Sequence, residues 1–214
     1  MTPRAISECN SFSPVTRLAG CIVGVVCLLL SAGISSAQTT ATEHFNKGIE
    51  WLNEGEPDKA IPEFSKAIEL DPKMADAYYQ RGAKTIDVGG NMAAAMKDLD
   101  KAIALDPKHS DALVTRGDAW EKQKEWDKAI ADYTKYILLN RHEPNGYSPG
   151  FIGRGRCRIE KKDYAGAIED LTKAVQNFPK SSWAYEQRAI AYDKAGEKEK
   201  AAADRKMVES LKPR

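Results

Sequence analysis

The sequence predicts an all-α protein in which antiparallel helix pairs stack into a solenoid. Three segments carry the same pattern, namely AIPEFSKAIELDP at 60–72, AMKDLDKAIALDP at 95–107 and AIEDLTKAVQNFP at 167–179. Apolar residues recur in each at three- and four-residue spacing, which is typical of a helix with one buried face, and a proline closes the helix. The segments return at intervals of about 35 residues or twice that, and internal repeats of this length indicate a solenoid.

Upstream of each such helix the sequence predicts another amphipathic helix, which comes first in its pair and has a small residue at its centre. These central residues are Gly48, Gly82, Gly117, Gly155 and Ala189. Small residues also recur in the second helices, at Ala60, Ala95, Ala129, Ala167 and Ala201. Gly or Ala lets two crossing helices approach closely, whereas a larger side chain would overpack the contact. Each unit has a face that it buries only against a neighbour, so the stacked units share one core.

This pattern resembles the tetratricopeptide repeat, a unit of two antiparallel helices in 34 residues. The resemblance covers 38–214 and places five repeats at 41–74, 75–109, 110–143, 148–181 and 182–214. Core residues follow the crossing at Phe64, Leu99, Tyr133 and Leu171, and closing prolines stand at Pro72, Pro107, Pro179 and Pro213. The resemblance implies a right-handed superhelix whose first helices line a concave surface, where a peptide or protein partner binds.

The register of the resemblance also places particular side chains on that concave surface. They are Phe45, Ile49, Leu52, Tyr79, Ala83, Ile86, Asp111, Val114, Asp118, Glu121, Ile152, Arg156, Ile159, Trp183, Glu186, Ile190 and Asp193. The N-terminal end of this set is apolar, the middle is acidic, and the fourth repeat adds a cation. The candidate partner-binding residues are Phe45, Ile49, Leu52, Tyr79, Ile86, Val114, Ile152, Arg156, Trp183 and Ile190. Exposed apolar patches often mark interaction sites; alternatively, the residue stretch 38–41 or neighbouring side chains cover these positions.

Residues 1–37 are interpreted as a secretory signal. Arg4 and Arg17 precede the apolar run LAGCIVGVVCLLL at 18–30, and the small residues Ser35 and Ala37 stand at the −3 and −1 places before Gln38. This run is shorter than the roughly 20 residues that a membrane-spanning helix needs. We therefore expect an exported protein, in a bacterial periplasm or secreted. Continuation of the apolar stretch through 34 leaves an uncleaved inner-membrane anchor, and hence a membrane-tethered assembly factor, as the alternative.

Composition and charge argue against several functional classes. Lys and Arg total 32 against 31 Asp and Glu, for a net charge of +1, whereas nucleic-acid binding needs a clustered basic excess. Cys157 is the one cysteine outside the predicted signal, at a place where the family has a small buried residue, and the histidines are scattered along the chain. We therefore expect no nucleic acid, metal, cofactor or enzymatic activity, and membrane contact only if the N-terminal segment is retained.

Arginines recur just before the central small residue of four predicted repeats, at Arg81, Arg116, Arg154 and Arg188. One interpretation is a ladder of cations that bind a partner. The interpretation we favour is that the aliphatic stems pack between helices while the charged heads lie in water.

The junction between the third and fourth repeats is expected to be irregular. Tyr136 replaces the small alanine of the neighbouring repeats, four extra residues follow at 144–147, and Gly150 and Gly153 weaken the next helix. The larger side chain should push the fourth repeat outward. The possible results are a hinge, a loop that contacts the partner, or a tolerated insertion.

Overall fold

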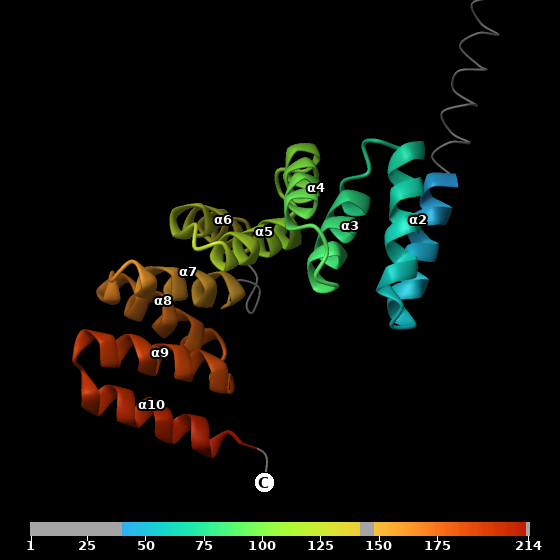
Figure 1. Ribbon diagram of the computed structural model, residues 1–214. Coiled ribbons are helices and arrows are strands. Elements are labelled where there is room, and N and C mark those ends of the chain that lie inside the picture. Colours follow the sequence, from blue (N-terminus) through green and yellow to red (C-terminus); the bar gives the residue numbers. More distant parts are fainter. Residues whose placement is uncertain (1–39, 142–147, 213–214) are drawn as a thin grey trace, which may run out of the picture.

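The computed structural model describes residues 40–141 and 148–212, and within these ranges the chain is all-α (Figure 1). Ten helices form five antiparallel pairs in the described ranges. The first helices cover 40–53, α3 (Ala75–Asp87), α5 (Ser110–Lys122), α7 (Ser148–Glu160) and α9 (Ser182–Ala195). The second helices are α2 (Pro57–Leu70), α4 (Met92–Leu105), α6 (Trp126–Leu139), α8 (Tyr164–Asn177) and α10 (Lys198–Ser210).

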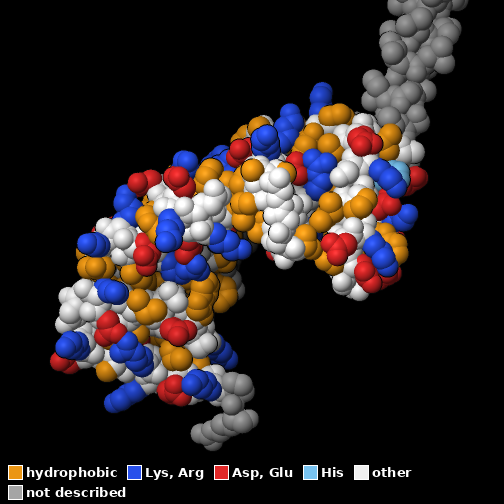
Figure 2. Space-filling model, viewed as in Figure 1, with side chains coloured by type: hydrophobic (Ala, Val, Ile, Leu, Met, Phe, Trp, Pro, Cys, Tyr) orange, Lys and Arg blue, Asp and Glu red, His pale blue; other side chains and the backbone are white. Residues whose placement is uncertain are grey.

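The helix pairs follow an arc, and the first helix of each pair lies on its inner side. Helices α3, α5, α7 and α9 contact one another in succession, whereas the even-numbered helices form no comparable contacts with each other. Elements on the inside of a curve lie closer together than those on the outside, so the odd-numbered helices form what we call the inner surface. Figure 2 shows the arched outline, with a hollow that opens toward the lower right of the view.

Side-chain size at the helix crossings explains the close packing within each pair. The predicted crossing residues are all fully buried: Ala60, Ala95, Ala129, Ala167 and Ala201. Central glycines of the first helices face large side chains of the second. A Cβ atom on Gly48 would lie 2.5 Å from the Phe64 ring, and one on Gly117 would lie 2.9 Å from the Tyr133 ring. These aromatic side chains therefore fit only because a glycine lies opposite, as the crossing pattern predicts.

The fourth repeat is not displaced outward, so this expectation from Tyr136 is wrong. The contact between α6 and α7 is more extensive than any other between adjacent described repeats. A Cβ atom on Gly150 would lie 2.6 Å from the Tyr136 ring, and one on Gly153 would lie 2.4 Å from the Tyr133 ring. The two glycines thus make room for the two tyrosines. The inserted residues 144–147 lie outside the described ranges.

None of the helices in the described ranges is long and apolar enough to cross a membrane. The segment 1–37, on which the expectations of a signal or an anchor depend, lies outside those ranges.

The crossing at Ala129 offers a test of the packing. Ala129→Leu should lower the free energy of unfolding by about 1–3 kcal/mol, because the added methyl groups have no space between α5 and α6. Urea denaturation followed by circular dichroism measures this loss. The matched control is Ala131→Leu on the exposed side of the same helix, which should change stability by less than about 0.5 kcal/mol. Equal unfolding curves for the two variants would contradict the helix register.

Candidate partner-binding surface

Most of the candidate partner-binding residues are at least partly exposed. Trp183 and Ile190 on α9 are the most accessible apolar members, at 45% and 37% exposure. Partial exposure is shared by Phe45, Ile49, Leu52, Tyr79, Ile86, Val114 and Arg156. Ile152 is a correction, because it is only 4% exposed and belongs to the core cluster that α7, α8 and α9 share. A partner cannot reach Ile152 without opening that core.

The apolar N-terminal part of this set also stabilises the fold. The Phe45 ring lies 5.6 Å from the Phe64 ring, between ring centroids, and packs against the cluster formed by Ala67, Ile68 and Ala77. Tyr79, Ile86 and Val114 pack in the same way against the core of the second and third repeats. Neighbouring side chains thus cover these residues in part, as the alternative interpretation proposed. Among the candidate partner-binding residues, Trp183 and Ile190 therefore contribute most of the exposed apolar surface.

A chain of side chains crosses the inner surface through three successive repeats. Arg156 on α7 donates a hydrogen bond to the Oε1 atom of Glu121 on α5. The same guanidinium carbon lies 5.4 Å from the centroid of the Trp183 ring on α9. A cation next to a carboxylate and over an indole ring is stabilised by both. Arg156 is therefore held between the third and fifth repeats.

The buried hydroxyl of Tyr133 approaches this network from α6. It donates to Asp118 Oδ1 at 2.6 Å, and Glu121 Oε2 lies 3.1 Å from it. Burial, and then the Asp118 carboxylate, raises the pKa of Tyr133 above its usual value, so the hydroxyl keeps its proton and remains a donor. Burial also raises the pKa of Glu121, although Arg156 opposes that shift. The centre of the inner surface thus combines two carboxylates with one guanidinium.

The recurrent arginines bind carboxylates that are buried or, at Asp98, partly buried, so the expectation that their heads lie in water is wrong. The Nε and Nη2 atoms of Arg81 each donate to a carboxylate oxygen of Asp98 at 2.7 Å. The same geometry, at 2.7–2.9 Å, joins Arg116 to Asp132, Arg154 to Asp170 and Arg188 to Asp204. The second helix of the same repeat supplies each aspartate. Two parallel hydrogen bonds of this kind fix orientation as well as charge pairing.

Each of these arginines also reaches back to the preceding repeat through Nη1. The acceptors there are Ser65 for Arg81, Asp100 for Arg116, Thr134 for Arg154 and Thr172 for Arg188, at 2.7–3.4 Å. The guanidinium donors are thus used within the fold, which disfavours the ladder of partner-binding cations. A sequence signal existed for these pairs, because an aspartate recurs 16 or 17 residues after each arginine.

The first repeat has a weaker version of this interaction. Lys47 replaces the arginine and lies 3.4 Å from Glu63, while the Nδ1 atom of His44 donates to the same carboxylate at 2.6 Å. The hydrogen bond from His44, with smaller contributions from the neighbouring lysines, lowers the pKa of Glu63 to about 2. Glu63 is therefore ionised at neutral pH, with several single-point donors in place of one guanidinium fork.

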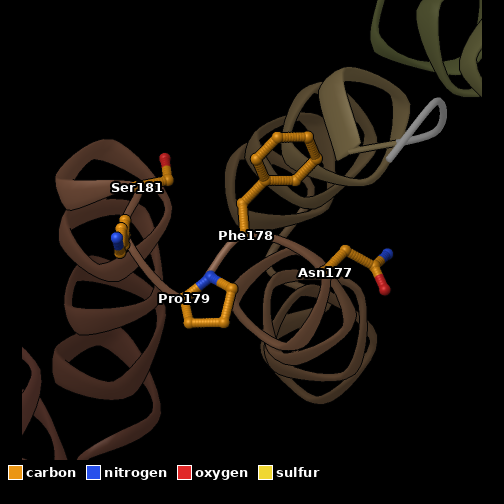
Figure 3. Close-up of a pocket in the computed structure, with 5 residues that line it drawn as sticks. Asn177, Phe178, Pro179 and Ser181 are labelled. Carbon is orange, nitrogen blue, oxygen red and sulfur yellow. The ribbon is translucent and has the colours of Figure 1, made fainter. Parts of the chain in front are cut away.

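The cysteine thiol and the surface pocket in the described ranges are not arranged for catalysis. Burial raises the pKa of Cys157 to about 12, so its thiol stays protonated and unreactive at neutral pH. No three His, Cys, Asp or Glu residues within 40–141 and 148–212 are close enough to share a metal ion. Figure 3 shows the residues that line a pocket at the α8–α9 turn, which are five consecutive residues, 177–181. Because all five residues belong to one turn, this pocket does not bring together an acid, a base and a nucleophile from different elements.

Comparisons with known proteins agree with the repeated fold. Family models described as tetratricopeptide repeat match residues 41–74, 89–145 and 152–181. The human protein named DnaJ homolog subfamily C member 3 is 29% identical over 181 residues, which cover 79% of this chain and 36% of that protein. The chain thus spans about a third of the length of the curated relatives that it matches.

Solved structures with the same fold come from several proteins. MamA from Desulfovibrio magneticus RS-1 is 19% identical, with a TM-score of 0.73 over 80% of this chain and 94% of that one. PilF of Pseudomonas aeruginosa is 20% identical, with a TM-score of 0.72 over 84% and 79% of the two chains. PilW, described as a type IV pilus biogenesis factor, is 17% identical, with a TM-score of 0.70 over 80% and 77%.

Arg116 allows a matched comparison, because it binds one buried and one exposed aspartate. Asp132→Asn should lower the free energy of unfolding by about 2–3 kcal/mol, since it removes the negative charge and replaces one of the two acceptor oxygens with a donor. Asp100→Asn should cost less than about 1 kcal/mol, because the Asp100 side chain is 56% exposed and its pairing is screened by solvent. Denaturant titration of both variants gives the difference. Similar small losses would show that the paired guanidinium bonds do not stabilise the repeat.

Proposed function

Because the chain is a tetratricopeptide repeat protein with several tandem helix pairs, we propose that it is a non-enzymatic scaffold that binds a protein or peptide partner on its inner surface. The observation that carries this proposal is the exposure of Trp183 and Ile190 on α9, with the Arg156 guanidinium over the Trp183 ring. Aromatic residues and arginine are the side chains that most often dominate binding at protein interfaces. Their presence on an inner helix favours that surface over the outer one.

We further propose that the scaffold acts outside the cytoplasm. The basic start, the apolar run at 18–30 and the small residues before Gln38 support a cleaved secretory signal. The fold is also that of PilW, a type IV pilus biogenesis factor, which is consistent with a role in assembling envelope structures. A membrane-tethered assembly factor is the second candidate, and it differs in retaining the N-terminal segment.

The inner surface is tested by capture of a partner from bacterial envelope extract with the tagged full chain. Trp183→Ala should reduce the amount captured about tenfold, because it removes the largest exposed apolar contact, and Tyr79→Ala should act in the same direction. Quantitative mass spectrometry measures the captured partner, and circular dichroism confirms that helical content is unchanged. Leu138→Ala is the control, since Leu138 is 60% exposed on the outer helix α6. Undiminished capture by both inner variants would move the binding surface elsewhere.

Export is tested by N-terminal sequencing of the protein recovered from the envelope fraction. The mature chain should begin near Gln38. A chain that still begins at Met1 would exclude cleavage and favour the tethered factor.

A further inference from the structure

Helix α9 keeps two large apolar side chains in contact with solvent. Trp183 is 45% exposed and Ile190 is 37% exposed, although both belong to an inner helix. They are seven residues apart, so they lie on one face of α9, about 10 Å from each other along its axis. Among the large exposed apolar residues of the described chain, no other two have this spacing. The two side chains form what we call the α9 stripe, which the described fold leaves open.

The Trp183 ring is held in place by the neighbouring repeat. The Arg156 guanidinium carbon lies 5.4 Å from the centroid of this ring, and Arg156 also donates a hydrogen bond to Glu121 on α5. The guanidinium is thus fixed from one side and restrains the indole ring from the other. A restrained side chain loses less conformational entropy when a partner packs on it. Trp183 is therefore a preorganised contact for a partner.

Two charged side chains on the same face of α9 have no ion pair within the described chain. Glu186 follows Trp183 by three residues and Lys194 follows Ile190 by four, so both lie beside the α9 stripe, and both are exposed. Asp193, the remaining carboxylate of this face, is paired with an arginine of α10. Glu186 and Lys194 are therefore the two charges of α9 that remain available to a partner.

The charges alternate in sign along the α9 stripe. Arg156 lies at its Trp183 end, Glu186 lies between the two apolar residues, and Lys194 follows the second. The complementary order on a partner is acidic, apolar, basic, apolar and acidic. Because this order is the same in both directions, it fits a partner that runs parallel or antiparallel to α9.

The spacing of the apolar residues distinguishes a helical partner from an extended one. Residues on one side of an extended segment recur at about 7 Å, and then at about 14 Å, so neither spacing matches the distance of about 10 Å along α9. Residues seven apart on a helix have that same distance, and the residue three or four after the first lies between them. Apolar anchors at such positions are typical of helices that bind in a groove.

We propose that the inner surface formed by α7 and α9 binds an amphipathic helix of a protein partner, with two apolar residues seven apart packed on Trp183 and Ile190. A lysine or arginine between them pairs with Glu186, and acidic residues beyond them face Arg156 and Lys194. This inference rests on the proposed function, because it specifies the chemistry of the partner at the same inner surface. A second copy of this chain fits poorly, since its described helices expose no such apolar pair outside α9.

The experiment uses the purified full chain and fluorescein-labelled, alanine-based helical peptides. The matching peptide has two leucines seven residues apart, a lysine between them and a glutamate one turn beyond each leucine. The inverted peptide exchanges these lysine and glutamate residues, and charges on the opposite face bring both peptides to zero net charge. Fluorescence anisotropy should give tighter binding of the matching peptide than of the inverted one. A matching peptide with a proline between the leucines should also bind more weakly, because proline breaks the helix.

Variants of the protein locate the site. Trp183→Ala should weaken binding of the matching peptide about tenfold. Glu186→Lys should abolish the preference for the matching over the inverted peptide. The controls lie on the outer helix α10: Met207→Ala removes a side chain that is 39% exposed, and Glu199→Lys makes the same charge change at an exposed position. Both controls should leave affinity and preference unchanged.

Equal affinity for the matching and inverted peptides, or for the matching and proline-containing peptides, would overturn the assignment. So would the absence of measurable binding, or a dimer in light scattering that Trp183→Ala dissociates, which would place a second copy on the α9 stripe. Capture from envelope extract separates these failures from failure of the proposed function. If Trp183→Ala prevents capture while Glu186→Lys leaves it unchanged, the charge assignment is wrong and inner-surface binding stands. If Trp183→Ala, Tyr79→Ala and Glu186→Lys all leave capture unchanged, inner-surface binding is wrong as well.

Discussion

In four of the five repeats, one arginine guanidinium joins three helices. It donates two hydrogen bonds to an aspartate on the paired helix and a third to the second helix of the preceding repeat, as Arg154 does with Asp170 and Thr134. A buried ion pair contributes little net stability compared with well-packed apolar residues, but the loss of one partner is costly. These pairs thus disfavour alternative arrangements of the helices. They hold the orientation in which the alanine and glycine crossings can pack.

This use of the arginines also shapes the inner surface. Their donors are satisfied within the fold, so they add little free positive charge to the concave side of the arc. Arg156, which precedes Cys157 and lies outside this series, pairs with Glu121 instead. The acidic side chains on α5 therefore determine the electrostatic character of the centre of the inner surface. The arginine–aspartate pairs that order the repeats therefore also limit the positive charge that the inner surface presents to a partner.

Much of the architecture could be predicted because it depends on local periodicity. The helix pairs and the crossing alanines follow from apolar spacing and from the limited room between crossing helices. The arginine–aspartate pairs were missed although both residues recur, because the two partners lie on different helices and apolar periodicity does not connect them. The burial of Ile152 depends on how α7 packs against α8 and α9. The close α6–α7 contact depends on how Gly150 and Gly153 complement Tyr136 and Tyr133 across two repeats. Single-repeat patterns contain no information about that complementarity.

Hydrogen exchange of the full chain, free and bound to its captured partner, tests inner-surface binding most directly. Partner contact on the inner surface should slow amide exchange in α3, α5 and α9, because bound side chains suppress local opening of the helices that carry them. Exchange in α4 and α6 should change much less. Slower exchange confined to α4, α6 and α8 would place the partner on the outer surface and contradict the account.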